Sequence, residues 1–363
     1  MRSGARQRRA GVGLERLSVL VVEDNSFARN MITEILRALK LGRVVPAADG
    51  AEAIAMLRQA SKHKSASDVL GFDIILSDYL MPSINGTMLL RWVRQHEDSP
   101  DRFVPFVMIS GVAGGDVVRE ARDVGATEFL AKPFSVKSVA EHIQVLVDSP
   151  RPFVFSNAYF GPERRRQKRP YNAKDRRVLK PEEQETVYST TKLKGLNTKV
   201  KVFYFQLPNR LREKVMGLGK SGPMKIDPEV LKAAEGQLDR METDYSDWVR
   251  GTVKQLVEAY DKAMADDRQR APMISQINRI SHDLRGQGTT FGYPLITVFG
   301  NSLFDCTTKI DKVPDKLLEF VKAHLDGITA VIRERIKGNG GPIGTELVES
   351  LERARERLAN TVE

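Results

Sequence analysis

Acidic side chains end two apolar runs of the sequence. Residues 73–86 read DIILSDYLMPSING, and their apolar start predicts a buried parallel strand that delivers Asp78 to its C-terminal end. The earlier run 17–22 ends in the same way at Glu23 and Asp24. Because open α/β sheets place their ligands at the carboxyl ends of the strands, we expect the three carboxylates to share one edge. Such groups repel one another, and a hard divalent cation with oxygen ligands, Mg²⁺, would relieve the repulsion.

Two more apolar runs end in polar residues. The run 104–109 is followed by Ser110, and the run 128–131 by Lys132. If these runs are neighbouring parallel strands, a hydroxyl and an ammonium group join the carboxylates at the same edge. The alternative interpretation is that the residues are unrelated helix caps and salt bridges.

Predicted strands and helices alternate five times in residues 17–148. The strands are expected at 17–22, 44–45, 74–76, 104–109 and 128–131, from apolar runs. The helices are expected at 26–40, 51–58, 87–95, 117–124 and 136–147, the first of them from apolar residues at helical spacing. Five such alternations predict a doubly wound, five-stranded parallel sheet with helices on both faces, and thus an α/β domain.

The residues at the predicted strand ends, with the motifs DYLMP at 78–82 and KPF at 132–134, resemble a known family. They are similar to the two-component receiver domain, of the CheY-like, flavodoxin-like kind, over residues 17–148. The resemblance implies that Asp78 is a nucleophile that accepts a phosphoryl group as an acyl phosphate. It implies that Mg²⁺ is bound by Glu23, Asp24, Asp78 and the backbone carbonyl of Leu80. It further implies that Lys132 pairs with the phosphate and that Ser110 donates a hydrogen bond to it.

Phe129 matches the position of the family's switch aromatic, three residues before Lys132. As a strand residue, Phe129 could equally belong to the core. The sequence leaves these two interpretations open.

Positive charge is concentrated outside the two predicted domains. The chain has 363 residues and a net charge of +10, and a length of this order predicts two domains. Residues 151–225 contain 19 lysine or arginine residues and 6 acidic residues, and residues 1–16 contain 5 and 1. High charge with few apolar residues predicts a basic tail at 1–16 and a basic, partly disordered linker at 149–225. A solvated linker is the favoured interpretation, and a contact with nucleic acid or an acidic surface is the alternative.

Two short parts of the predicted linker have more structured patterns. Residues 200–205 are apolar enough for a strand or a docking segment, and 209–218 place three apolar residues on one helical face. We expect this part of the linker to pack on a neighbouring domain.

Residues 226–363 show helical patterns without strand patterns, which predicts a helical bundle. Residues 281–292, in one of these helices, read SHDLRGQGTTFG and place His282, Arg285 and Gly286 on one face. Glycine within a helix costs about 1 kcal/mol relative to alanine, so Gly286 calls for a reason. A lone helical histidine is more often a satisfied or solvated residue than a site.

The pattern at 281–292 resembles the histidine phosphotransfer (HPt) domain, a four-helix bundle with an exposed phosphoryl-carrying histidine. The resemblance implies that His282 carries the group, that Arg285 steadies the transferred charge and that Gly286 leaves room for an approaching receiver. The other histidines, at positions 63, 96, 142 and 324, form no cluster at ligand spacing and are expected at the surface.

Several classes of protein are disfavoured. The single Cys306 excludes an intramolecular disulfide and cysteine-based metal clusters, and a reducing cytoplasm is expected. No apolar run approaches the roughly 18 residues of a membrane helix, and the N-terminal arm lacks the apolar segment of a signal peptide. No glycine-rich ATP-binding module is present, which disfavours a kinase.

The two resemblances together predict a phosphorelay protein. Its expected partners are an upstream histidine kinase and a downstream receiver protein. The alternative is a response regulator whose output is protein or nucleic-acid binding through the basic linker, with His282 inactive.

Overall fold

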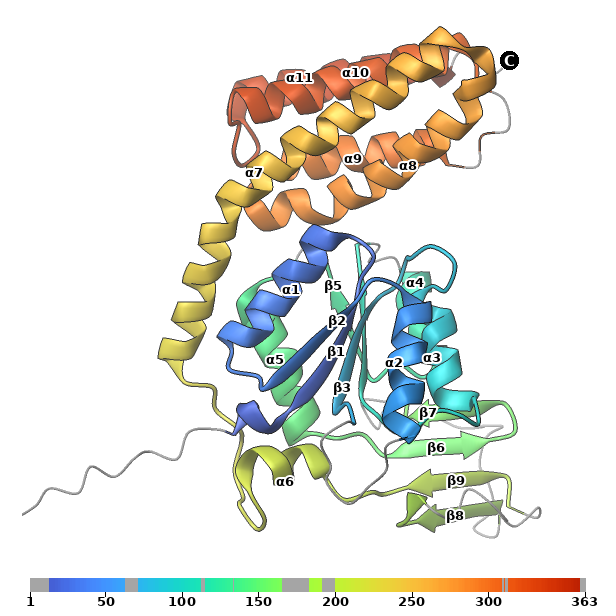
Figure 1. Ribbon diagram of the computed structural model, residues 1–363, viewed down its shortest axis with the longest axis vertical. Coiled ribbons are helices and arrows are strands. Elements are labelled where there is room, and N and C mark those ends of the chain that lie inside the picture. Colours follow the sequence, from blue (N-terminus) through green and yellow to red (C-terminus); the bar gives the residue numbers. More distant parts are fainter. Residues whose placement is uncertain are drawn as a thin grey trace, which may run out of the picture. The chain divides into compact units, whose positions relative to one another are not determined.

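The structure is a computed structural model, and it describes residues 13–62, 71–111, 115–132, 134–164, 183–190, 200–308, 310 and 313–359. The chain divides into two compact units (Figure 1). The first unit comprises Met1–Ala131 and Val136–Gln237, and the second comprises Lys132–Ser135 and Leu238–Glu363. The predicted tail at 1–16 falls mostly outside the described residues.

A five-stranded, all-parallel sheet forms the centre of the first unit. Its strands are β1 (Ser18–Val22), β2 (Arg43–Ala47), β3 (Ile74–Asp78), β4 (Phe106–Ser110) and β5 (Glu128–Ala131), in the order β2-β1-β3-β4-β5. Its helices are α1 (Ser26–Ala38), α2 (Gly50–Lys62), α3 (Gly86–Gln95), α4 (Gly115–Val124) and α5 (Val136–Asp148). In Figure 1, α1 and α5 cover one face, and α2, α3 and α4 cover the other. The predicted doubly wound parallel sheet is confirmed.

The central strands are buried along their whole length. Every residue of β3 and β4 is buried, as expected for strands covered by helices on both faces. The core includes Leu20, Ile75, Leu89 and Phe106, which come from strands and from the face of α3 that packs on them. The polar ends of β3 and β4 are therefore held by a rigid apolar layer.

In its described part, the segment 149–225 is folded and is not the solvated linker that was favoured, although the strand expected at 200–205 and the helix expected at 209–218 are both present. It contains β6 (Phe153–Ser156), β7 (Tyr159–Pro162), β8 (Gln184–Val187), β9 (Val202–Phe205) and the helix α6 (Arg210–Met216). The strands form a second sheet in the order β7-β6-β9-β8, with only β8 and β9 parallel. The physical reason is a buried apolar cluster of five side chains, Phe153, Phe160, Val187, Phe203 and Phe205.

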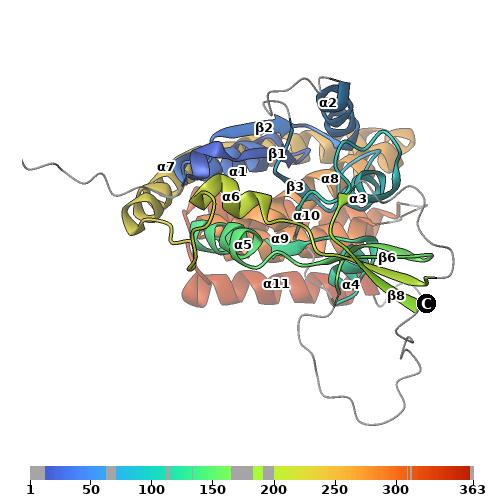
Figure 2. The same ribbon diagram turned by 90° about the horizontal axis from the view of Figure 1, so that it is seen from below.

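The second sheet packs on α3, α4 and the connection between α3 and β4 in the same unit. The ring of Phe103, in the connection between α3 and β4, lies 5.1 Å from that of Phe153 and 5.3 Å from that of Phe205. Arg94 of α3 is fully buried, and its guanidinium lies 5.1 Å from the centre of the Phe153 ring. Figure 2 shows α6 beside α5, where Asn209 Nδ2 donates a 2.7 Å hydrogen bond to the Val147 carbonyl. Residues 149–225 therefore extend the α/β domain.

The second unit is helical, as predicted. It contains α8 (Arg270–Gln287), α9 (Pro294–Thr307), α10 (Asp315–Arg333), α11 (Gly341–Ala359) and the part of α7 (Pro228–Ala265) that follows residue 237. Helix α8 packs on α9, α9 on α10, and α10 on α11. The helices predicted at 228–240 and 248–264 are one continuous helix, α7.

His324 of α10 is fully buried, so its predicted surface position is wrong. Its Nδ1 lies 2.7 Å from the Phe320 carbonyl, and the rings of Phe320 and Phe299 pack edge-on against it. His63 lies outside the described residues. Throughout the described parts of the chain, each helix is too short or too polar to span a bilayer.

Candidate functional site

Three carboxylates meet at the carboxyl end of the main sheet. Glu23 and Asp24 directly follow β1, and Asp78 is the last residue of the neighbouring strand β3. One ligand oxygen from each of the three lies within 4.8 Å of those of the other two. Glu23 and Asp78 are each only 2% exposed, and Asp24 is partly exposed. The structure thus brings together the three predicted acids, which form the acid cluster.

Main-chain contacts fix the loops that carry these acids. The Leu80 amide donates a 3.1 Å hydrogen bond to Asp78 Oδ2, which holds one oxygen of the carboxylate. A Cβ on Gly86, the first residue of α3, would lie 2.2 Å from the Asp78 carbonyl oxygen, so any larger residue would force the backbone to shift there. Asn25 caps α1 by accepting a hydrogen bond from the Ala28 amide. The ends of β1 and β3 are therefore both tightly constrained.

The acid cluster fits a hard cation such as Mg²⁺. Such ions prefer carboxylate oxygens, and close carboxylates of like charge need a cation to stay ionised together. The acids lie at a sheet edge, with two of them buried, so they could hold an ion that keeps several waters.

Two other predicted residues stand at neighbouring strand ends. Ser110 is the last residue of β4, is 2% exposed, and pairs in register with Ala131 of β5. Lys132 directly follows Ala131 in the chain. Pro133 of the KPF motif lies outside the described residues.

Phe129 is half-buried in β5 and packs against the main core cluster. Its backbone pairs with Met108 in β4. This environment is compatible with both interpretations of Phe129 that the sequence left open.

Tyr79 forms a contact that sequence reasoning missed. Its hydroxyl donates a 2.7 Å hydrogen bond to Glu120 Oε2 in α4. Burial, and then the hydrogen bond and negative charge of Glu120, raise the pKa of Tyr79 to about 12. The residue next to Asp78 is therefore a neutral donor tied to α4. Its only sequence signal was a tyrosine directly after the acid.

Arg29 was missed as well. It lies in the first turns of α1 and donates hydrogen bonds to the main-chain carbonyls of Glu23 and Asp24. An arginine five residues beyond an acid pair is a weak signal, because a helix start can direct that side chain to many partners.

His282 lies on α8 in the second unit, with a side chain that is 20% exposed. Its Nδ1 is 3.8 Å from Asp283 Oδ1, and its ring centre is 5.9 Å from that of Phe304. Arg285 is 8% exposed, and its guanidinium lies 3.8 Å from the centre of the Phe304 ring. The sequence predicted an arginine presented beside the histidine, whereas Arg285 stacks on an aromatic ring. Gly286, one turn beyond His282, is partly exposed.

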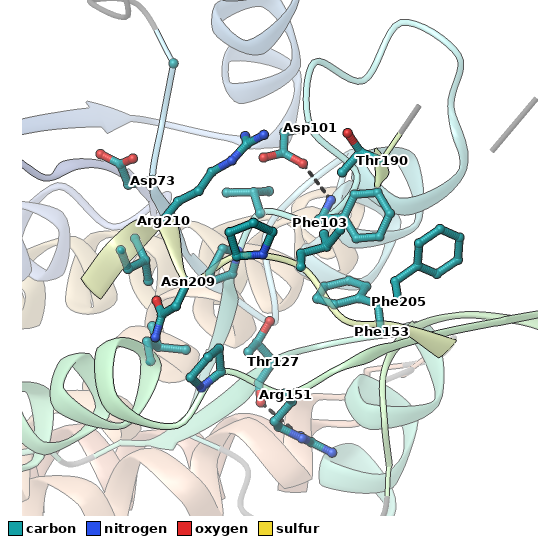
Figure 3. Close-up of a pocket in the computed structure, with 18 of the residues that line it drawn as sticks. Asp73, Asp101, Phe103, Thr127, Arg151, Phe153, Thr190, Phe205, Asn209 and Arg210 are labelled. Carbon is teal, nitrogen blue, oxygen red and sulfur yellow. Dashed lines mark hydrogen bonds between the residues drawn. The ribbon is translucent and has the colours of Figure 1, made fainter. Parts of the chain in front are cut away.

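A cavity of about 1240 Å³ lies within the first unit and does not include the acid cluster (Figure 3). Asp73, which precedes β3, lines it together with Phe103 and Arg151. Two of its charged side chains are engaged within the protein: Asp73 accepts hydrogen bonds from the Ser18 amide and Lys214, and Arg151 donates one to the Thr127 carbonyl. The cavity is therefore lined by other residues than those predicted to form the site.

Comparison with known proteins points to one family for the first unit. Residues 19–144 match the family described as "Response regulator receiver domain". Over 132 residues the chain is 30% identical to the chemotaxis protein CheY of Pseudomonas aeruginosa, covering 36% of this chain and 97% of that protein. It is 26% identical to the chemotaxis protein CheY-3 of Vibrio cholerae, covering 36% and 92%. Among solved structures, Vibrio cholerae CheY4 is 31% identical, with 35% of this chain and 96% of that chain covered and a TM-score of 0.30.

Proposed function

This chain belongs to the response regulator receiver family through residues 19–144, and from that premise we propose that it is a phosphorelay intermediate. Asp78 accepts a phosphoryl group from a phosphohistidine on an upstream histidine kinase. His282 transfers a phosphoryl group to or from a receiver aspartate. The observation that carries the proposal is the acid cluster, three carboxylates within 4.8 Å at the ends of β1 and β3.

In the first transfer, a carboxylate oxygen of Asp78 attacks the phosphorus of the donor. The phosphorus–nitrogen bond breaks, its electron pair returns to the imidazole nitrogen, and an acyl phosphate forms. Bound Mg²⁺, held by Glu23, Asp24, Asp78 and the Leu80 carbonyl, would neutralise the charge of the phosphoryl oxygens. The hydrogen bond from the Leu80 amide to Oδ2 orients the carboxylate.

Lys132 and Ser110 complete the proposed acceptor site. The ammonium group of Lys132 pairs with the new phosphate, and the hydroxyl of Ser110 donates a hydrogen bond to it. Ser110 pairs in register with Ala131, and Lys132 directly follows Ala131, which supports these roles. Phe129, on β5 three residues before Lys132, is proposed as the switch aromatic that responds to phosphorylation of Asp78.

The second unit is proposed to be an HPt-like four-helix bundle that carries His282. The sequential packing of α8, α9, α10 and α11 supports this arrangement, and the side chain of His282 is accessible in part. Gly286 leaves one turn of α8 without a side chain beside the histidine. Arg285, held against Phe304, keeps a positive charge one turn from His282.

The test is phosphorylation of the full-length chain and of two variants, Asp78→Ala and His282→Ala. Each is incubated with Mg²⁺ and a phosphorylated histidine kinase or a small phosphodonor, and intact mass is measured. The wild-type chain should gain acid-labile phosphohistidine and base-labile acyl phosphate. Asp78→Ala should lose the base-labile fraction, and His282→Ala the acid-labile one.

His142→Ala is a matched control, because His142 is a partly exposed histidine of the first unit and outside the proposed chemistry. It should label as the wild type does. If His282→Ala leaves all phosphate transfer unchanged, the relay is refuted and only the receiver function survives. If Asp78→Ala still forms an acyl phosphate, the acceptor assignment is wrong.

A further inference from the structure

An arginine outside the acid cluster holds the loop that carries two of its members. The Nη1 atom of Arg29 donates a 2.6 Å hydrogen bond to the main-chain oxygen of Glu23 and a 3.1 Å one to that of Asp24. From the other side, the Glu23 amide donates a 3.2 Å hydrogen bond to the Ala47 carbonyl at the end of β2. The peptide units around Glu23 are thus fixed from two directions.

Arg29 is itself held firmly by α1. Its amide donates to the Asn25 carbonyl at 2.9 Å, and its carbonyl accepts a 2.7 Å hydrogen bond from the Thr33 hydroxyl. The neighbouring residues Ala28 and Ile32 are buried in the core. The backbone that carries the side chain is therefore already ordered by α1, so only the arginine side chain itself has to be ordered to hold the loop.

We propose that Arg29 is a positioning residue for Mg²⁺ at the acid cluster. The inference rests on the proposed function, because it takes the acid cluster as a Mg²⁺ site. Without the ion, the carboxylates of Glu23, Asp24 and Asp78 repel one another, and a loop free to move would spread them apart. The two hydrogen bonds from Arg29 oppose that movement and keep the carboxylates close enough to share one cation.

The arginine contacts carbonyl oxygens and leaves the carboxylate oxygens available as ligands. Residues outside the ligand set that orient ligands typically change metal affinity by about 10- to 100-fold when they are replaced. The guanidinium also carries a positive charge, which repels a cation. If orientation outweighs repulsion, replacing Arg29 weakens Mg²⁺ binding. If repulsion is the larger effect, the replacement strengthens it.

The experiment measures Mg²⁺ affinity of the full-length chain by isothermal titration calorimetry. We expect Arg29→Met to bind Mg²⁺ about 10- to 100-fold more weakly than the wild type. Arg29→Lys can present one ammonium to the same two oxygens and should recover most of the affinity. Arg37→Met is the control, because Arg37 lies on the same helix, is exposed and pairs only with the exposed Glu34 among the described residues.

Hydrogen exchange of the metal-free chain provides a second readout. Arg29→Met should speed exchange at the amides of residues 23–25 and leave the amides of β3 as protected as in the wild type. The melting temperature of the first unit should not change. An Arg29→Met chain that binds Mg²⁺ as tightly as the wild type, or more tightly, overturns this proposal alone. A wild-type chain that binds no Mg²⁺ overturns it together with the proposed function.

Discussion

The buried histidine of α10 should make the stability of the second unit depend on pH. Burial lowers the pKa of His324 from 6.5 to about 4, although the Phe320 carbonyl partly offsets this effect. Its Nε2 has no hydrogen-bond partner among the described residues, so a proton there would be buried without compensation. The folded state therefore keeps the ring neutral.

The sign and size of the effect follow from linkage. Below about pH 6.5 the unfolded chain binds a proton at His324 that the folded chain does not, so stability falls as pH decreases towards 4. A shift of this size corresponds to about 3 kcal/mol in total. Between pH 7 and pH 5 we expect a loss of about 2 kcal/mol from this one residue.

The assay is urea unfolding of the full-length chain, followed by tryptophan fluorescence. The chain has two tryptophans: Trp92 in α3 and Trp248 in the part of α7 that belongs to the second unit. In a Trp92→Phe background, Trp248 alone reports on that unit. Between pH 7 and pH 5, Trp92→Phe/His324→Leu should lose about 2 kcal/mol less stability than Trp92→Phe, because it lacks the buried imidazole.

The reasoning is refuted if replacement of His324 leaves the pH dependence between 5 and 7 unaltered. It is refuted equally if the chain with His324 becomes more stable as the pH falls. Direct titration of the His324 ring by NMR should place its pKa well below 6.5.

Two further substitutions test the first unit. Arg94 donates hydrogen bonds to the carbonyls of Gly125, Arg102 and Val104, so Arg94→Met should cost at least about 3 kcal/mol in urea unfolding, whereas the exposed Arg91→Met should cost under about 0.5. Gly86→Ala forces a Cβ against the Asp78 carbonyl and should cost about 1–3 kcal/mol and slow acyl phosphate formation. Gly71→Ala, whose Cβ meets open space, is its control and should change neither quantity, so equal effects of the two would contradict the packing argument.

The α/β architecture was predictable because its signals are local and repeated. Buried parallel strands such as β3 and β4 must be apolar throughout, and the polar residue that ends such a run marks the sheet edge. Asp78, Ser110 and the pair Glu23 and Asp24 could therefore be assigned to one edge before any coordinates. Parallel topology then brings the three acids close together, as the acid cluster shows.

The second sheet could not be predicted from composition. Its strands have four residues each, and the abundant lysine and arginine between them dominate the average over 149–225. The useful signal was the alternation of aromatic residues, such as Phe153 with Phe155 and Phe203 with Phe205, which places one set on a single face. That signal is too short to outweigh the charge of the segment.

His324 and Arg29 show two different limits of prediction from the sequence. His324 follows Phe320 by one turn and precedes Ile328 by another, so helical spacing alone could have placed it on the buried face of α10. For Arg29, no spacing rule was available, because its partners are main-chain oxygens. Side chain–backbone contacts leave no complementary residue in the sequence to recognise.

The receiver fold and the second sheet also depend on each other physically. Arg94 is buried partly under Phe153, and a Cβ on Gly125 would approach the Phe160 carbonyl at 3.0 Å, so β6 and β7 pack closely on α3 and on the end of α4. A chain ending at residue 148, the boundary predicted from sequence, would remove the ring over Arg94 and expose the apolar side chain of Phe103 to water. The family match ends at residue 144, but the compact unit that contains Asp78 continues through the second sheet. Experiments on the acceptor site therefore need the whole first unit.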